Sequence, residues 1–479
     1  MGVLSNIEPG AVFHFFEAIS SIPHGSGNTK EISNYLVRFA KERNLTHYQD
    51  ELGNVIILKE ASAGYEEKEP IMLQGHVDMV AVKKPESKMD MKKDGLKLMV
   101  EGDFLFAEDT SLGGDDGIAV AYELALLDAK DISHPPLECI FTVDEEIGLI
   151  GAGAIDLTLC KAKRMINLDS EEEGIFLAGC AGGLRVDCRL GWNWEKVQGI
   201  ACQVTIGGLT GGHSGVEIHK GRGNSNVLAG RFLLYAANRV RFRILEIKGG
   251  LADNAIPRET VIGLVVGDPF GLEYAAQEFN AILKQEYRTK DPEVFCRFEP
   301  KEPGTFHTVT WEDSRRAAAL IGCLPAGVQA WSADVEGLVE TSLNMGLMKS
   351  SKKELTLGLS LRSSFESAKE SLKNQIFALT EGLGGSCTAT GTYPGWAYQK
   401  DSPLRDTMAR VYGRMYGEKP QIEAIHAGLE CGFFVEKIPD LDCVSIGPDM
   451  KDIHTTEERM SISSVRRTWE FLCQVLREL

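Results

Sequence analysis

Several residues that could bind metal ions stand where strand-like runs of the sequence end. His76 and Asp78 directly follow the apolar run at residues 71–74, and in an extended chain two such residues point to the same side. A histidine at such a position can bind a metal ion while the carboxylate fixes the tautomer of its imidazole ring. Alone, this tripeptide is weak evidence, because most His-x-Asp sequences are structural.

Carboxylates occupy two further positions of this kind. Asp115 stands in the Gly-Gly-Asp-Asp-Gly run at 113–117, at a predicted helix start, where an aspartate is also an ordinary N-cap. Glu145 and Glu146 belong to three adjacent acids that end the apolar run at 140–143. Adjacent acids at the mouth of a buried strand repel one another unless protons or a cation relieve the charge. This cluster is therefore the more specific signal.

Asp169 and His454 complete the set. Asp169 ends the apolar run at 165–168, and His454 follows the Ile-Gly-Pro run at 446–448. Open α/β sheets gather such strand ends at one edge, where their functional sites lie. Imidazole mixed with carboxylate suits zinc, cobalt or manganese, and a shared carboxylate suits two ions roughly 3.5–4 Å apart. The spacing thus predicts a metal centre at a sheet edge.

The elements around these residues predict an α/β fold. Helical periodicity at 9–22 and 28–43 gives way to strand-like runs, and a further helix should begin near Asp116. The alternation indicates a central mixed sheet flanked by helices. The strand-like runs of this first part lie at 54–58, 71–74, 137–143 and 164–168.

The pattern changes from about residue 187. Alternating runs at 200–206 and 354–360 and an amphipathic helix at 224–241 predict a smaller α+β domain. Residues 393–396 read as a linker, after which a helix at 402–416 and a strand at 442–446 resemble the first part. We therefore expect a catalytic domain of residues 1–186 and 395–479, interrupted by an inserted domain of residues 187–394.

Composition excludes several classes of protein. The chain has 479 residues with 69 acidic against 51 basic side chains, a formal net charge of −18, which disfavours binding to nucleic acid. No apolar run reaches the roughly 18 residues of a membrane span, and the first ten residues do not resemble a signal peptide. The 11 cysteines form no CxxC pair, which favours a reduced, cytoplasmic protein without a disulfide framework.

The motifs together resemble those of the M20 metallopeptidases and, within them, the aminoacyl-histidine dipeptidases (Xaa-His dipeptidases, carnosinase-like). The resemblance covers essentially the whole chain. The run Asp-Ser-Glu-Glu-Glu-Gly at 169–174, followed by Gly-Cys-Ala-Gly-Gly at 179–183, is specific to that branch. The shared motifs are His-Val-Asp at 76–78, Gly-Asp-Asp-Gly at 114–117, Asp-Glu-Glu-Ile-Gly at 144–148, Asn-Leu-Asp-Ser-Glu-Glu-Glu-Gly at 167–174, and Ile-Gly-Pro with His454.

The resemblance implies a zinc-peptidase-like domain interrupted by an inserted lid and dimerisation domain, and it implies a role for each candidate. Asp115 would bridge two Zn²⁺ ions, with Mn²⁺ or Co²⁺ as alternative metals. Asp78 would orient a ligand, and Glu145 would act as general base and acid. The metal ligands would be His76 and Asp169 at one ion, Glu146 and His454 at the other, and Asp115 at both.

The inserted domain carries three further candidates. His213, in the Gly-Gly-His-Ser-Gly run at 211–215, could stabilise an oxyanion, although such a glycine-rich loop could also be a simple turn. In the family the matching histidine reaches the active site of the other subunit of a homodimer. The resemblance also implies that Asn254 and Arg362 hold the carboxylate of the substrate, a group that an arginine fork binds well.

These implications predict hydrolysis of dipeptides, with Xaa-His dipeptides such as β-alanyl-histidine as the expected substrates. Two alternatives stay open from the sequence. An aminoacylase or a tripeptidase would share the metal centre, because the chemistry at the carbonyl is the same. A metal-free binding homologue without activity would be a different class, and the retention of Glu145 with all five ligand positions disfavours it.

Overall fold

The computed structural model describes residues 2–479, which divide into two compact units. Unit 1 comprises residues 2–179 together with Tyr398–Ala424 and Leu429–Leu479. Unit 2 comprises Cys180–Ala397 and Ile425–Gly428. Each unit has its own extensive apolar core of buried side chains, so each is described by itself below.

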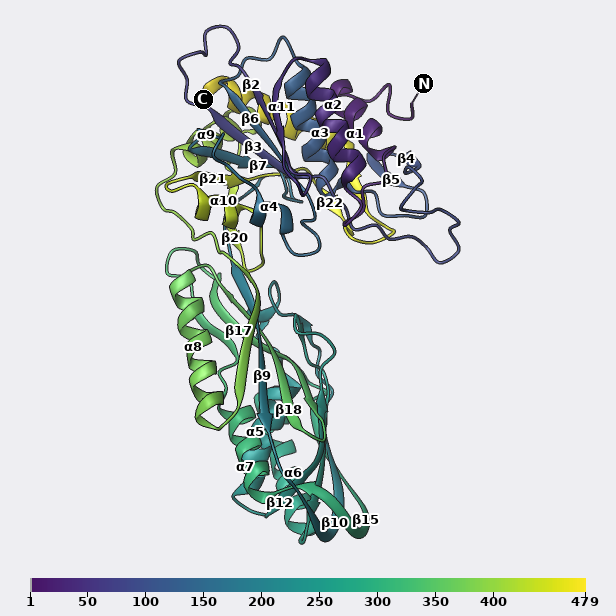
Figure 1. Ribbon diagram of the computed structural model, residues 1–479, viewed down its shortest axis with the longest axis vertical. Helices are drawn as coiled ribbons and strands as arrows, with labels where there is room; N and C mark the ends of the chain where they lie inside the picture. Colours follow the sequence, from purple (N-terminus) through teal and green to yellow (C-terminus); the bar gives the residue numbers. More distant parts are fainter. Residues whose placement is uncertain (1) are drawn as a thin grey trace. The chain divides into compact units, whose positions relative to one another are not determined.

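Unit 1 is built on an eight-stranded sheet in the order β1-β2-β6-β3-β7-β21-β8-β20 (Figure 1). The inner strands β6, β3, β7 and β21 run parallel to one another, whereas the neighbours on both sides are antiparallel, so the sheet is mixed. Every residue of β3 and β6 is buried, as expected for strands covered on both faces. The strands are β1 (Thr46–Gln49), β2 (Val55–Lys59), β3 (Ile71–His76), β6 (Leu137–Thr142), β7 (Arg164–Asn167), β8 (Ile175–Cys180), β20 (Gln421–Ile425) and β21 (Asp442–Ser445).

Helices flank this sheet. The helix α3 packs against β3 and α1, and α9 packs against β21 and α11 (Figure 1). A second sheet of four short strands, in the order β22-β23-β5-β4, belongs to the same unit. The remaining elements of unit 1 are α1 (Gly10–Ser20), α2 (Lys30–Glu42), β4 (Leu98–Glu101), β5 (Phe104–Ala107), α3 (Gly114–Asp128), α4 (Ile150–Ala154), α9 (Pro403–Tyr416), α10 (Cys431–Lys437), β22 (Met450–Lys451), β23 (Arg459–Ser461) and α11 (Ile462–Glu478).

Unit 2 contains a nine-stranded antiparallel sheet in the order β15-β10-β14-β12-β17-β18-β9-β19, with β16 paired to β17. Helices α5 and α7 pack together, and α8 packs against β9 and β18 (Figure 1). The elements are β9 (Gly182–Gly191), β10 (Trp194–Gly207), β11 (Gly212–His213), η1 (Ile218–Lys220), α5 (Ser225–Ala237), β12 (Phe242–Gly249), β13 (Ala255–Ile256), β14 (Thr260–Val266), α6 (Pro269–Glu286), β15 (Phe295–Val309), α7 (Trp311–Cys323), β16 (Gly327–Trp331), β17 (Val339–Ser350), β18 (Glu354–Ser363), α8 (Glu366–Gly382) and β19 (Ser386–Tyr393).

One sequence-based expectation differs from this structure in detail. The segment 393–396 is not a free linker, because Trp396 is 2% exposed and pairs with Cys180 through backbone hydrogen bonds. A tryptophan that buries its ring holds the chain against its own unit. Helix α3 spans Gly114–Asp128, but the backbone of Asp115 and Asp116 is non-helical, so its regular turns begin after Asp116, in agreement with the predicted helix start. Within residues 2–479, no helix combines the length and apolarity that crossing a membrane requires.

Candidate metal centre

The carboxyl ends of two neighbouring parallel strands carry the first pair of candidate ligands. His76 is the last residue of β3, and Asp169 follows the end of β7. The imidazole Nε2 of His76 lies 3.6 Å from Asp169 Oδ1, and the histidine side chain is 1% exposed. The parallel pairing of β3 with β7 therefore brings two residues that are distant in sequence to one point.

Asp115 lies between the two histidines. Its Oδ1 is 3.0 Å from His76 Nε2, and its Oδ2 is 3.0 Å from His454 Nε2. His454 belongs to the connection between β22 and β23, and its Nε2 is also 2.8 Å from Glu146 Oε1. Each oxygen of one carboxylate thus faces a different imidazole, which is the arrangement that a carboxylate shared by two cations requires.

Three groups in the described chain bring potential ligand atoms within 4.8 Å of one another. All of them include predicted metal ligands, and two members were not predicted as ligands: Glu145, the predicted general base, and Asp116, which the sequence did not single out. The groups are His76 with Asp116 and Asp169, His76 with Glu145 and Glu146, and Asp115 with Glu146 and His454. The donor set of imidazole nitrogen and carboxylate oxygen fits zinc, manganese or cobalt.

Asp78 fixes both His76 and the neighbouring acidic turn. His76 Nδ1 donates to the backbone carbonyl of Asp78 at 2.9 Å and lies 3.5 Å from its carboxylate, which leaves Nε2 free to act as a ligand. The Asp78 carboxylate also accepts hydrogen bonds from the backbone N–H of Glu145 at 3.0 Å and of Glu146 at 3.3 Å, and from the Ser26 hydroxyl at 2.8 Å. Asp78 therefore orients the turn that carries the two glutamates.

Glu458 holds the backbone segment that directly precedes Asp115. The carboxylate of Glu458 accepts hydrogen bonds from the backbone N–H groups of Leu112, Gly113 and Gly114 at 2.8, 3.2 and 2.8 Å. These N–H groups precede the first turn of α3, so Glu458 holds the segment from which Asp115 projects. Sequence reasoning missed this residue, because a single glutamate in a polar stretch gives no signal of a partner more than 340 residues away.

A buried polar network behind the sheet edge was also missed. Glu430 Oε2 accepts hydrogen bonds from Gln74 and Thr142 at 2.6 Å each, and Gln74 accepts one from Asn167 at 2.7 Å. Gln74, Thr142 and Asn167 lie on β3, β6 and β7, so the network ties together the three strands that end at the centre. The sequence around Glu430 does not mark it as a partner of Gln74 and Thr142, which lie more than 280 residues earlier in the chain.

The electrostatics show an excess of buried negative charge. Burial raises the pKa of Glu145 well above its ordinary value, and burial raises the pKa of Asp169 to about 7 against the opposing charge of His76. Hydrogen bonds to Asp115 and Glu146 raise the pKa of His454 to about 10. Carboxylates gathered in this way are relieved by protons or by bound cations.

The other three candidates lie together in unit 2. His213 ends β11, which pairs with β13, and the backbone N–H of Ser214 donates to the carbonyl of Asn254 at 2.8 Å. Arg362, on β18, is 9% exposed and donates from Nη1 to the Tyr393 hydroxyl at 3.0 Å. The structure thus groups His213, Asn254 and Arg362 in one unit and the seven other candidates in the other.

The hydrogen bonds of His213 define its tautomer. Its Nδ1 accepts from the backbone N–H groups of Gly215 and Val216 at 3.2 and 3.3 Å, so in the neutral ring Nε2 carries the proton. Burial and the charge of Arg362 lower the pKa of His213, which favours the neutral ring. His213 is therefore set up as a hydrogen-bond donor through Nε2. The side chain of Asn254 is exposed.

The mixed sheet, its inserted unit and the cluster of imidazoles and carboxylates at the sheet edge define a metal-binding hydrolase of the peptidase type. Residues 72–478 match the sequence profile of the Peptidase family M20/M25/M40, so the chain belongs to this family. This result confirms the family resemblance, the predicted α/β fold class and the prediction of a peptidase.

Two relatives match over nearly their full length. The chain is 35% identical to the cytosol non-specific dipeptidase of Escherichia coli (strain K12), over 100% of this chain and 99% of the relative. The crystal structure of the aminoacylhistidine dipeptidase from Vibrio alginolyticus superposes with a TM-score of 0.95 at 34% identity, covering 100% of this chain and 98% of that one. The aminopeptidase PepT from Bacillus cereus ATCC 10987, with a TM-score of 0.56 at 16% identity over 98% of this chain and 99% of that one, shares the fold.

Proposed function

We propose that this protein is a dipeptidase that works with two metal ions. His76 and Asp169 would hold one ion, Glu146 and His454 the other, and Asp115 both. The observation that carries the proposal is the position of Asp115, whose two oxygens each lie 3.0 Å from a different imidazole. The names of the Escherichia coli and Vibrio relatives, both dipeptidases, support the reaction.

Two Zn²⁺ ions are the proposed cofactor, with Mn²⁺ or Co²⁺ as alternatives, because the donors combine imidazole with carboxylate. Two divalent cations bound at this centre lower the pKa of a water molecule and polarise the scissile carbonyl. The protein groups supply the remaining steps. Asp78 fixes His76 through Nδ1, so that Nε2 stays directed toward the centre.

Glu145 is the proposed general base and acid. It would accept a proton from the attacking water and deliver it to the leaving amine, a role that typically contributes ~10²–10⁴-fold to the rate. The backbone contacts of Asp78 hold the turn of Glu145, and burial raises the pKa of its carboxyl, which favours the proton-carrying form needed for the second transfer.

Replacing Glu145 by glutamine tests this role. Glu145→Gln should retain both metal ions, because the residue is not a proposed ligand, and should lose at least about 99% of kcat, as the general-base contribution implies. Elemental analysis and turnover are measured on the same preparation. A variant that keeps more than about a tenth of the wild-type kcat would show that Glu145 is not the base.

We also assign roles to the residues of unit 2. His213 would donate from Nε2 to the oxyanion that forms at the scissile carbonyl, which suits its tautomer. Arg362 and Asn254 would bind the substrate carboxylate. The Arg362 Nε and the Ser214 hydroxyl are buried without a hydrogen-bond partner in the described chain, which leaves donors available to a bound ligand. By the family resemblance, the protein would be a homodimer in which His213 serves the partner subunit.

Dipeptides with a C-terminal histidine, such as β-alanyl-histidine, are the proposed substrates, and the cytoplasm is the proposed location. A substrate panel decides among the alternatives, assayed with and without a chelator. It comprises β-alanyl-histidine, alanyl-histidine, glycyl-leucine, a tripeptide and an N-acetyl amino acid. Chelator-sensitive cleavage of the dipeptides supports the proposal. Preference for the tripeptide or the N-acetyl amino acid would indicate a tripeptidase or an aminoacylase, and a protein that binds no metal and cleaves nothing would indicate a binding homologue.

A further inference from the structure

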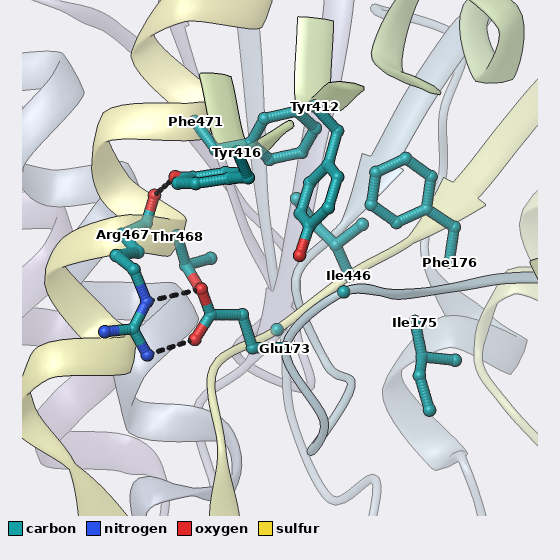
Figure 2. Close-up of a pocket in the computed structure, with 11 residues that line it drawn as sticks. Glu173, Ile175, Phe176, Tyr412, Tyr416, Ile446, Arg467, Thr468 and Phe471 are labelled. Carbon is teal, nitrogen blue, oxygen red and sulfur yellow. Dashed lines mark hydrogen bonds and ion pairs between the residues drawn. The ribbon is translucent and has the colours of Figure 1, made fainter. Parts of the chain in front are cut away.

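The loop that carries Asp169 ends in an ion pair outside the proposed metal-ligand set. Both carboxylate oxygens of Glu173 accept hydrogen bonds from Arg467 on α11, at 2.7 Å from Nε and 2.6 Å from Nη2 (Figure 2). The Glu173 side chain is 13% exposed and that of Arg467 is 37% exposed. A two-pronged contact of this kind fixes the direction of the carboxylate as well as its distance.

The same loop is cross-linked to the segment that leads to His454. The backbone N–H of Glu173 donates to Asp449 Oδ1 at 2.8 Å, and the N–H of Met450 donates to the carbonyl of Glu171 at 2.9 Å. The N–H of Asp449 in turn donates to the hydroxyl of Ser464 on α11 at 2.8 Å. Any displacement of one loop therefore reaches the other, and both rest on α11.

The β22–β23 hairpin transmits this arrangement to His454. Met450 begins β22, which pairs with β23, and His454 lies in the connection between these two strands. Asp169 lies at the start of the loop that contains Glu173. His454 lies in the hairpin that the chain enters after Asp449. One ion pair thus stabilises the backbone on which a ligand of each proposed metal site is mounted.

The helix that carries Arg467 is itself held firmly. Phe176, Tyr412 and Phe471 pack with ring centroids 5.5–5.7 Å apart, and the Tyr416 hydroxyl donates to the Arg467 carbonyl at 2.8 Å (Figure 2). These contacts position the backbone of α11 without help from the guanidinium. Removing the Arg467 side chain should therefore release the loops while the helix stays in place.

We propose that Arg467 is a positioning residue for both metal sites, acting through Glu173 on the loop of Asp169 and, through the shared loop contacts, on the hairpin of His454. This inference rests on the proposed function. Metal affinity distinguishes this role from simple stabilisation of the fold. An ion pair that only stabilises the fold would alter the unfolding of the protein and leave its affinity for metal unchanged.

The test uses the full chain, stripped of metal and titrated with Zn²⁺ against a competing chelator. Arg467→Met should weaken binding at both positions by about 10–100-fold, the range found when supporting contacts of metal ligands are removed. Arg467→Lys should fall between this variant and the wild type, since an ammonium group cannot bind both oxygens of Glu173 in the same way. Glu173→Gln should weaken both positions as well.

A matched control lies on the same helix. Glu478, the last residue of α11, pairs with Arg410 at 2.5 Å and also with Arg414, and both arginines lie on α9. Glu478→Gln therefore weakens two ion pairs of α11 away from the loops of Asp169 and His454 and should leave both Zn²⁺ affinities as in the wild type. Thermal unfolding of the metal-free variants, recorded in parallel, measures the structural contribution of each pair separately from metal binding.

Four results bear on the proposal. Weaker binding at both positions in Arg467→Met, with no further loss in the Arg467→Met/Glu173→Gln double variant, supports a shared pathway. Unchanged binding in Arg467→Met and Glu173→Gln, even with lower unfolding temperatures, overturns it. Weaker Zn²⁺ binding at just one of the two positions overturns the claim that Arg467 supports both sites. A wild-type chain that binds no Zn²⁺ would instead overturn the proposed function, and this inference with it.

Discussion

Binding of Zn²⁺ to the metal-free protein should release protons from the two histidines of the centre. Hydrogen bonds to Asp115 and Glu146 raise the pKa of His454 to about 10, and the pKa of His76 is also raised well above its ordinary value by the carboxylates around it, although burial opposes them. A histidine whose pKa lies well above 7, as that of His454 does, is protonated at pH 7. Since only the neutral imidazole binds a metal ion, each histidine must lose its proton first.

The expected magnitude follows from these groups. His454, with a pKa of about 10, releases about one proton at pH 7, and Asp169, whose pKa is raised to about 7 by burial, adds about half a proton; the raised pKa of His76 adds to this release. With more than one proton released, the apparent affinity for the pair of ions should rise by more than about tenfold for each pH unit near neutrality. Binding should weaken correspondingly as the pH falls, because protons then compete for the same nitrogens.

Isothermal titration calorimetry in buffers of different ionisation enthalpy counts the released protons directly. The wild-type chain should release more than one proton for the filled centre, and a His454→Gln variant should release about one fewer. The same titrations at several pH values give the slope of the logarithm of the apparent Zn²⁺ affinity against pH. Release of one proton or less by the wild type, or a slope below one, would refute the assignment of both imidazoles as ligands.

Three further experiments test other parts of the proposed site. Asp115→Ala should lower metal occupancy at both positions, whereas Glu146→Ala should affect mainly one; elemental analysis measures this, and loss of a single ion in Asp115→Ala would disprove the bridge. A His213→Ala chain mixed with a Glu145→Gln chain should recover about a quarter of wild-type activity if His213 acts across a two-fold dimer, since roughly half the dimers are hybrids with one competent site; hybrids confirmed by pull-down but inactive would exclude that arrangement. Glu458→Gln weakens three backbone contacts and should lower the free energy of unfolding by about 1–3 kcal/mol in urea titrations; unchanged stability would argue against its positioning role.

The parts of the fold that local patterns govern were predictable from sequence. Mainly apolar runs such as 71–74 and 137–143 are typical of buried strands, and the structure places them in β3 and β6. His76, Glu146 and Asp169 follow such runs, so their proximity at one sheet edge could be expected from the parallel pairing of β3, β6 and β7. Asp115, in contrast, comes from the start of α3, and His454 comes from the connection between β22 and β23. The predicted α/β class and the family resemblance were confirmed for this reason.

The supporting contacts could not be predicted in the same way. Glu458 and Glu430 contact residues more than 280 positions earlier in the chain, and nothing in their own surroundings marks them as buried acids. The regular turns of α3 begin after Asp116, as predicted, but the non-helical backbone of Asp115 and Asp116 cannot be read from helical periodicity. Contacts of this type depend on the assembled fold, which single-sequence patterns do not contain.

The backbone conformations of two residues at the site also depend on the assembled fold. Asp144 and His454 adopt left-handed conformations, with φ of 55° and 61°, which cost about 1–3 kcal/mol in residues other than glycine. At Asp144 the side chain accepts a hydrogen bond from the backbone of Gly27 at 2.7 Å, and the N–H of the next residue donates to Asp78. At His454 the paired strands β22 and β23 hold the connecting turn. The direction of Glu145 is therefore set by segments distant in sequence, and the hairpin that carries His454 is itself paired to β5 through β23, so the proposed metal centre is a property of unit 1 as a whole and not of the motifs that reveal it.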